Sequence, residues 1–416
     1  MFRRWFVKKL IEDVTCAGCY CACDDIQVTI DGQQILEVQT TCSQGQAWFE
    51  RAGETDQLVP RIQGKPVSQA AAIKQAVELI QQAQAPLVTG LSQSSTAAQR
   101  AAVALADQIG AVIDTGASAG TRALQQVGEA TCTLGEVRSR ADLIIYWGAA
   151  DLLANARHRQ TLETDSPEMT RKIIAIGEES ARATDHADEF IAVEPQREIE
   201  VIWQLRSLLK GIALAGNEPV GITESQLQSL ASQLKQSQYI VFFTGPEFKQ
   251  GPLSHRKLEA LSLLIREIQR ERRCHSISVP ASGETKGAEH VLAWQTGYAA
   301  AVNFAAGFPC YSPAEYQASR LLEQSEVDLC ILTGGNPLAG LSAQALGNLK
   351  SVPSIVIGST LPQDFQPEVF LPTGITGIQF PGSMYRYDGT PLPLRGFLPT
   401  VQNSEADVLK QISNSL

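Results

Sequence analysis

The sequence lacks any apolar run long enough to cross a membrane. Of its 416 residues 44% are hydrophobic and 19% are charged, but no window approaches the roughly 18 uncharged apolar residues of a membrane helix. The basic residues at the start of the chain are followed by Glu12 and Asp13 before any apolar segment of a secretory signal begins. We therefore expect a cytoplasmic protein with no membrane partner.

The chain also lacks an excess of positive charge. Lys and Arg total 34 against 44 Asp and Glu, which gives a formal net charge of −10. Proteins that coat nucleic acid phosphates carry the opposite balance, so we expect no nucleic acid partner. A P-loop, a G-x-G-x-x-G fingerprint and a nucleophile motif are all missing. Hydrolysis by this chain itself therefore has no support in the sequence.

Cysteines, in contrast, are concentrated near the start of the chain. Cys16, Cys19, Cys23 and Cys42 follow the spacing C-x2-C-x3-C-x18-C, and Cys21 adds a thiol inside it. Such clustering in a reduced compartment indicates a metal site rather than disulfides. A [4Fe-4S] cluster fits four thiolates at this spacing, whereas zinc sites usually use two C-x2-C pairs. We predict these four cysteines as iron–sulfur ligands, with zinc or an empty site as the alternatives.

The remaining cysteines and one histidine carry weaker signals. Cys132, Cys274, Cys310 and Cys330 stand alone in apolar segments, where we expect buried, inert thiols. His186 has no second metal ligand at a useful spacing, so we interpret it as the start of a surface helix.

The order of predicted elements indicates an α/β fold. An N-terminal hairpin of residues 26–30 and 35–38 turns at Asp31 and Gly32. Strand, helix and strand then alternate, which predicts doubly wound parallel sheets. We expect a Cys-rich β module at 1–60 and α/β domains at 61–215 and 216–416, each of which can be discontinuous, with a polar connection at 216–238 and an irregular tail from Pro372 that wraps back over earlier parts. The predicted strands are 87–90, 111–114, 143–148, 172–177, 190–193, 239–245, 329–334 and 354–358, and the helices are 68–82, 95–109, 198–209 and 256–269.

Several blocks of residues, taken in order, resemble one known family. They are residues 23–26, 41–49, 131–142, 146–148, 156–158, 294–298, 307–309, 311–313 and 382–392. The chain resembles the B subunit of formylmethanofuran dehydrogenase, a branch of the molybdopterin oxidoreductases. The resemblance implies the fold of formate dehydrogenase and dimethyl sulfoxide reductase, domains I to III: an iron–sulfur module and two α/β domains that enclose a bis-pterin metal centre.

The metal-binding loop departs from the family pattern. The family holds tungsten or molybdenum through a Cys or selenocysteine followed by His, and residues 115–121 contain neither. Ser118 is the one residue there that resembles the serine ligand of some wider relatives. The arginine that the family places before a glycine near residue 283 is Ala281 or Ser282. We therefore expect no molybdenum- or tungsten-pterin, and we assign no catalytic and no cofactor-binding residues.

Two further departures place acids where the family binds a pterin nucleotide. An Asn-Pro of the family reads Ala149, Ala150 and Asp151 here, and an Asp-Pro-Arg reads Glu178, Glu179 and Ser180. These carboxylates would repel a pyrophosphate. At the start of a helix, however, acids also favour the helix dipole, so a plain structural role is the alternative. We also expect bulky residues or collapsed loops to fill the ancestral pterin pocket.

Two polar pairs have equally good structural and functional interpretations. His158 follows Arg157 at a family position near the cofactor pocket. Asn336 and Pro337 follow a predicted strand, where doubly wound sheets bind ligands, but a plain turn fits as well.

The resemblance, with its departures, leads to three hypotheses. The first is the B subunit of a bacterial formyltransferase/hydrolase complex in tetrahydromethanopterin-linked one-carbon metabolism and formaldehyde oxidation. It would be a redox-inactive scaffold whose partners are the A, C and D subunits. The second is an active tungsten or molybdenum subunit of formylmethanofuran dehydrogenase. The third is an iron–sulfur electron-transfer module.

Overall fold

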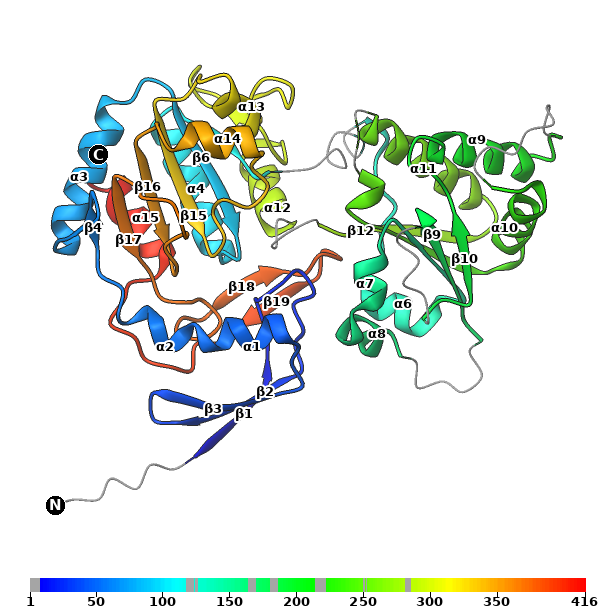
Figure 1. The fold of residues 1–416 in the computed structure, drawn as a ribbon, viewed down its shortest axis with the longest axis horizontal. Helices are drawn as coiled ribbons and strands as arrows, with labels where there is room; N and C mark the ends of the chain where they lie inside the picture. Colours follow the sequence, from blue (N-terminus) through cyan, green and yellow to red (C-terminus); the bar gives the residue numbers. More distant parts are fainter. Residues whose placement is uncertain are drawn as a thin grey trace. The chain divides into compact units, whose positions relative to one another are not determined.

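The computed structural model describes residues 8–116, 123, 126–163, 170–179, 186–213, 222–249, 251, 253–280 and 286–416. Among these residues no helix is long and apolar enough to cross a membrane. The chain forms two compact units (Figure 1). The first unit contains residues 1–117 and 282–416, and the second contains residues 118–281.

A nine-stranded mixed sheet forms the centre of the first unit. Its order is β14-β13-β7-β6-β15-β16-β17-β4-β5, and the five central strands are parallel. Leu87 on β6 pairs with Cys330 on β15, so two segments far apart in sequence lie side by side. The strands are β4 (Arg61–Ile62), β5 (Lys65–Pro66), β6 (Pro86–Ser92), β7 (Val112–Asp114), β13 (Val302–Asn303), β14 (Cys310–Tyr311), β15 (Leu329–Gly334), β16 (Ser354–Gly358) and β17 (Val369–Pro372).

Capped amphipathic helices cover this sheet. Ser68 and Ser95 each accept a hydrogen bond from the backbone of the first turn of α3 and α4. The apolar faces of α3, α4, α12 and α15 share one buried core with β6 and β15. The helices of this layer are α3 (Gln69–Gln82), α4 (Thr96–Gln108), α12 (Lys286–Thr296) and α15 (Glu405–Ser413). Helices α13 (Ala318–Glu323) and α14 (Ala343–Leu349) share a second buried core with the alternate residues of the same strands.

The N-terminal module packs against the C-terminal tail within the first unit. Figure 1 shows the hairpin β18–β19 beside α1 and β2. Trp48 and Ile26 of the module share a buried core with Ile378 and Met384 of the tail. The prediction that the tail wraps back over earlier parts is confirmed. The elements are β1 (Lys9–Val14), β2 (Ile26–Asp31), β3 (Gln34–Gln39), α1 (Ser43–Glu50), α2 (Ala52–Thr55), β18 (Gly382–Tyr385) and β19 (Pro391–Leu394).

The tail is more regular than the sequence predicted. It contains a hairpin and the helix α15, which begins after Ser404 caps the backbone N–H of Asp407. Its Gly- and Pro-rich composition hid this helix, because the amphipathic segment is only nine residues long.

A five-stranded parallel sheet forms the second unit, in the order β10-β9-β8-β11-β12. Its apolar core includes Trp147, Phe242 and Phe248. The strands are β8 (Leu143–Trp147), β9 (Lys172–Gly177), β10 (Glu189–Ala192), β11 (Tyr239–Thr244) and β12 (Arg273–Ser278), and the helices are α6 (Leu134–Arg140), α7 (Ala150–Ala154), α8 (Ala156–Leu162), α9 (Glu198–Leu209), α10 (Glu224–Gln236), the 3-10 turn η2 (Glu247–Lys249) and α11 (Ser254–Ile268).

The units divide the chain at other places than the sequence predicted. The stretch 216–238, interpreted as a connection between domains, contributes the capped helix α10 to the second unit. Strands β8 and β11 pair with each other, and β6 pairs with β15. The second unit is therefore inserted into the sequence of the first, and the pairing of the strands determines where each unit begins and ends.

Candidate functional site: a thiol cluster and the carboxyl edges of two sheets

Five cysteines of the N-terminal module lie together, and we call them the thiol cluster. They are Cys16, Cys19, Cys21, Cys23 and Cys42. A backbone hydrogen bond from the Cys16 N–H to the Cys23 carbonyl, 2.8 Å long, closes the loop that carries four of them. The β2–β3 hairpin returns the chain to this loop, so that Cys42 faces it from the N-cap position just before α1. Burial raises the pKa of Cys16, and the thiols of Cys19, Cys23 and Cys42 raise it further.

The thiol that the spacing left over is also part of the cluster. A hydrogen bond from Cys21, helped by backbone N–H groups, lowers the pKa of Cys19 to about 7. The same bond, followed by burial, raises the pKa of Cys21. Electrostatic interactions with Cys23 and Cys42 raise the pKa of Cys21 further. The cluster therefore contains one thiol more than a four-iron centre binds.

The surroundings of the thiols suit a group that carries negative charge. Cys42 precedes α1, whose first N–H groups present the positive end of the helix dipole. The Arg51 guanidinium interacts electrostatically with Cys16. Within the described ranges, no three Cys, His, Asp or Glu side chains are grouped as ligands of one metal ion. Because each thiolate of a [4Fe-4S] cluster binds a different iron, its sulfurs need not converge on one point. The assignment of Cys16, Cys19, Cys23 and Cys42 to such a cluster therefore remains a prediction.

The carboxyl edge of the five-stranded sheet carries three acids. The strand order reverses between β8 and β11, and doubly wound sheets bind ligands outside such a point. Asp151 follows β8, Glu178 follows β9 and Glu247 follows β11. Burial raises the pKa of Glu247, and the carboxylates of Asp151 and Glu178 raise it further. The acids predicted at this edge thus lie near a third that the sequence did not reveal.

The backbone segments that follow β8 and β11 pack closely against each other. Gly148 has φ of 55°, and a Cβ there would lie 2.4 Å from the Phe248 nitrogen. A Cβ on Gly245 would lie 1.8 Å from the Gly148 carbonyl oxygen. The Phe248 side chain is fully buried beside them. The loops after the two strands therefore touch each other directly at the ends of β8 and β11.

Gly245→Ala is expected to lower the free energy of unfolding of the second unit by about 1–3 kcal/mol, because the new methyl group overpacks this contact. Gly177→Ala, at the end of the neighbouring strand β9, is the matched control, because no atom lies within 4 Å of a Cβ at that position. Urea unfolding of both variants measures the difference. Equal stabilities would contradict this close packing.

A buried ion pair lies behind this edge. Lys257 donates a 2.6 Å hydrogen bond to Oε2 of Glu198, and the Trp147 indole donates a 2.9 Å bond to Oε1. Both charged side chains are about 5% exposed or less. Burial raises the pKa of Glu198 to about 6 in spite of the lysine. The ion pair therefore joins the start of α9 to α11, and the Trp147 bond joins it to the end of β8.

The first unit has a similar edge between β6 and β15, where its strand order reverses. Glu405 of α15 accepts a 2.8 Å hydrogen bond from the Ser94 hydroxyl. Burial raises its pKa to about 7, although Ser94 and the Gly334 backbone N–H stabilise the charged form. A Cβ on Gly334 would lie 2.4 Å from the Ser92 carbonyl oxygen. At this edge also the backbones after two strands are in close contact, beside a carboxyl group whose pKa burial raises to about 7.

The two polar pairs hold structural contacts. His158 is buried, and its Nε2 lies 2.8 Å from the Tyr146 hydroxyl. Burial lowers its pKa to about 3, so the ring is neutral. The Asn336 carbonyl accepts a 2.9 Å hydrogen bond from the Ser92 hydroxyl, which fixes the Asn336–Pro337 turn against β6. Structural interpretations therefore account for both pairs.

The interpretation of His186 as a helix start is wrong, because His186 is exposed in a turn that leads into strand β10. The Asp188 carboxylate accepts a 2.7 Å hydrogen bond from the Ile173 backbone and so starts the strand pairing. Ser118, Ala281 and Ser282 lie outside the described residues.

Three of the four isolated cysteines are buried as predicted, namely Cys132, Cys274 and Cys330. Burial raises the pKa of Cys274, and it raises that of Cys330 to about 12. Cys310 is partly exposed, because it lies on β14 at the edge of the nine-stranded sheet.

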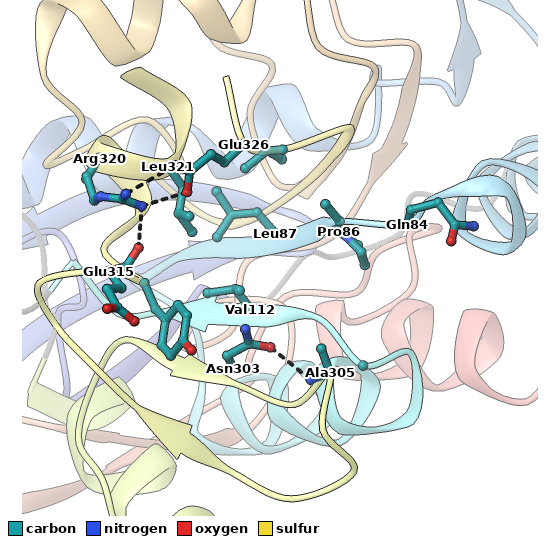
Figure 2. A pocket seen from close by; sticks show the side chains of 14 residues that line it. Gln84, Pro86, Leu87, Val112, Asn303, Ala305, Glu315, Arg320, Leu321 and Glu326 are labelled. Atoms are coloured by element: carbon teal, nitrogen blue, oxygen red, sulfur yellow. Dashed lines mark hydrogen bonds and ion pairs between the residues drawn. The ribbon is translucent and has the colours of Figure 1, made fainter. Parts of the chain in front are cut away.

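A cavity of about 360 Å³ lies at the opposite edge, near the amino ends of β6 and β7 (Figure 2). Leu87 and Val112 form part of its apolar wall. Figure 2 shows Arg320 bonded to the Glu326 carboxylate, at 2.6 Å, and to the Glu315 carbonyl, at 2.9 Å. Its guanidinium is therefore already neutralised, and doubly wound sheets bind ligands at the other edge.

Comparisons with known proteins agree with the resemblance in the sequence. No protein-family model matches the chain. The chain is 28% identical over 408 residues to the B subunit of the tungsten-containing formylmethanofuran dehydrogenase 2 of Methanocaldococcus jannaschii, with 93% of each chain covered. It is 25% identical over 427 residues to the protein of the same name from Methanococcus maripaludis, with 97% of this chain and 98% of that protein covered. The chain is a homologue of the B subunit of formylmethanofuran dehydrogenase.

Two solved structures share the fold of this B-subunit homologue. A chain of the formyltransferase/hydrolase complex FhcABCD from Methylorubrum extorquens, solved with methylofuran, has a TM-score of 0.71 at 22% identity, with 86% of this chain and 98% of that chain covered. Acetylene hydratase from Pelobacter acetylenicus has a TM-score of 0.67 at 10% identity, with 97% of this chain and 69% of that chain covered. The chain thus has the fold of these two structures, and the predicted α/β class is confirmed.

Sequence reasoning missed several residues of the B-subunit homologue that matter at its edges. Glu247 and Phe248 follow β11 in a short turn that carries no motif. Glu405 belongs to a helix in a tail that was expected to be irregular. Each gains its importance from a partner far away in the chain, and no local signal in the sequence points to it.

Proposed function

We propose that this homologue is the redox-inactive B subunit of a formyltransferase/hydrolase-type complex in tetrahydromethanopterin-linked one-carbon metabolism. In this role the chain supports partner subunits that carry out the chemistry, and it holds no molybdenum- or tungsten-pterin. The partners we propose are the A, C and D subunits, since the FhcABCD complex has a chain of the same fold.

The closely packed, acidic edge of the five-stranded sheet carries this proposal. A pterin nucleotide brings a pyrophosphate, which needs N–H donors and cations at the carboxyl ends of strands. Asp151, Glu178 and Glu247 meet there instead, and Phe248 packs against Gly148. The nearby Lys249 ammonium is engaged in a 2.9 Å hydrogen bond to the Ser278 hydroxyl, so it does not neutralise these carboxylates. Repulsion and steric exclusion therefore act in the same direction.

Metal analysis of the purified complex tests the proposal. We expect about four irons per chain, with tungsten, molybdenum and released pterin at the background of the buffer. We also expect no viologen reduction with formylmethanofuran. Tungsten or molybdenum in stoichiometric amount together with pterin would contradict the scaffold and establish the active dehydrogenase, the alternative that the names of both relatives favour.

The thiol cluster gives the iron measurement its own control. Cys42→Ser removes the one predicted ligand that lies outside the loop, so we expect its iron content to fall to less than half of the wild-type value. Cys310→Ser, a partly exposed cysteine on an edge strand, is the matched variant and should retain all of the iron. An equal iron content in both variants would show that the metal lies elsewhere.

An electron-transfer module is the remaining alternative. It would contain the same iron, but its cluster would be reduced reversibly and would exchange that electron with a partner ferredoxin. Electrochemical titration of the iron-loaded chain with and without the A, C and D subunits distinguishes it from a scaffold.

A further inference from the structure

The side chain of Gln93 joins the thiol cluster to the carboxyl edge of the nine-stranded sheet. Its Nε2 donates a 3.0 Å hydrogen bond to the carbonyl of Gly18, which lies between Cys16 and Cys19. Its Oε1 accepts a 3.4 Å bond from the Arg51 guanidinium. Gln93 therefore contacts the cysteine loop and also the residue that ends α1, the helix that Cys42 begins.

The backbone around Gln93 is held in a costly conformation. Leu91 and Gln93 have φ values of 63° and 57°, in the left-handed region that side chains with a Cβ seldom adopt. Such residues persist only where contacts on both sides fix them, and they gather at functional sites. A Cβ on Gly335 would lie 2.5 Å from Oε1 of Gln93, so a glycine there leaves room for the side chain.

The same loop is fixed on its other side by the sheet edge. The Ser94 hydroxyl bonds to Glu405 at 2.8 Å, and the Ser92 hydroxyl bonds to the Asn336 carbonyl at 2.9 Å. Leu91 is fully buried in the core below. The loop is thus hydrogen-bonded to α15 and to the turn that follows β15. On its other side Gln93 bonds it to the cysteine loop.

We propose that Gln93 is a positioning residue that couples occupancy of the thiol cluster to the order of residues 90–95. This inference rests on the part of the proposed function in which the thiol cluster binds iron and sulfide. Metal bonds to Cys16 and Cys19 fix the Gly18 carbonyl, and a bond to Cys42 fixes α1 and with it Arg51. Gln93 needs both partners in place to hold its strained backbone. In a scaffold without redox chemistry, the cluster thereby braces the N-terminal module against the α/β sheet.

Gln93→Met tests the coupling in the full-length chain, because methionine keeps the length of the side chain and loses both hydrogen bonds. Gln108→Met is the matched control, since Nε2 of Gln108 also donates a 3.0 Å bond to a backbone carbonyl, that of Ser413. Each protein is compared in iron-loaded and iron-stripped form. The measurements are the rate of iron release to a chelator and hydrogen exchange of peptides that cover residues 16–24, 90–95 and 239–244.

In the wild type and in Gln108→Met, removal of iron should speed exchange in residues 90–95 about tenfold and leave β11 of the second unit unchanged. In Gln93→Met, residues 90–95 should exchange fast in both forms, and iron should be released about ten times faster than from the wild type. A brace that depends only on folding would not give this dependence on iron.

The coupling is overturned if iron removal loosens residues 16–24 but leaves 90–95 unchanged in the wild type, or if Gln93→Met releases iron at the wild-type rate. A chain that takes up no iron overturns it as well. Tungsten or molybdenum in the complex would contradict the redox-inactive scaffold but leave these exchange results standing, so the two failures can be told apart.

Discussion

Replacing Lys257 with methionine is expected to lower the free energy of unfolding of the second unit by about 3–5 kcal/mol at pH 8. The lysine is the only charge partner that the structure gives the buried Glu198 within the described residues, at 2.6 Å. Methionine fills similar space next to the Phe248 ring but leaves a carboxylate whose solvation is not replaced. The Trp147 bond at 2.9 Å compensates in part. Urea unfolding, together with hydrogen exchange of the β8 and β11 amides, measures the loss.

The pH dependence and a double variant identify the cause. The pKa of Glu198 is already raised to about 6, from 4.5, in the presence of the lysine. A raised carboxyl pKa gives stability at low pH that is lost as the pH rises through the folded value. The cost of Lys257→Met should therefore be smaller at pH 5 than at pH 8. Adding Glu198→Gln removes the buried charge and should recover most of the loss, whereas an additive double variant would contradict the pair.

Glu405→Gln is expected to change the stability of the first unit in a way that depends on pH. Burial raises the pKa of Glu405 from 4.5 to about 7. The wild type should therefore lose stability relative to the variant as the pH rises from 4.5 through 7, by an amount on the order of 3 kcal/mol. The variant has no such titration. Unfolding free energies of both proteins, measured from pH 5 to pH 8, give the difference directly.

Comparison with the variant is needed because His158 acts in the opposite direction. Its pKa is lowered from 6.5 to about 3, so the unfolded chain binds the proton first and stability falls as the pH drops below 6.5. This effect is present in both proteins and cancels in their difference. A difference that stays constant between pH 5 and pH 8 would mean that Glu405 does not titrate near neutrality. In that case the Ser94 hydroxyl would donate a hydrogen bond to a carboxylate that is charged over the whole pH range.

The scaffold hypothesis concerns the carboxyl edges of both sheets and the contact between the thiol cluster and one of them. At the five-stranded sheet, Gly148 and Gly245 let the loops meet, and Asp151 and Glu178 add charge that an anionic cofactor would not tolerate. At the nine-stranded sheet, the corresponding loop is held by Gln93 from the side of the thiol cluster. In the scaffold hypothesis the thiol cluster would thus serve to hold this loop.

The local elements and the class of fold could be predicted from the amino acids alone. Helix α9 and strands β9, β15 and β16 have the predicted bounds, because apolar periodicity and terminal glycines act within a few residues of the chain. The resemblance in sequence also pointed to the homologues that the comparisons found. The spacing of the cysteines predicted that Cys42 returns to the loop of Cys16, since the hairpin between them is itself local.

Which distant residues meet could be read only from the folded chain. The pairing of β6 with β15 inserts the second unit into the first, and no property of either strand alone selects that partner. Glu198 and Lys257 are 59 residues apart, and Ser94 and Glu405 are 311 apart. Their charges and pKa values are set by burial, which is a property of the packed chain and not of any segment. For the same reason Gln93, an unremarked polar residue in the sequence, becomes the contact between the thiol cluster and the sheet.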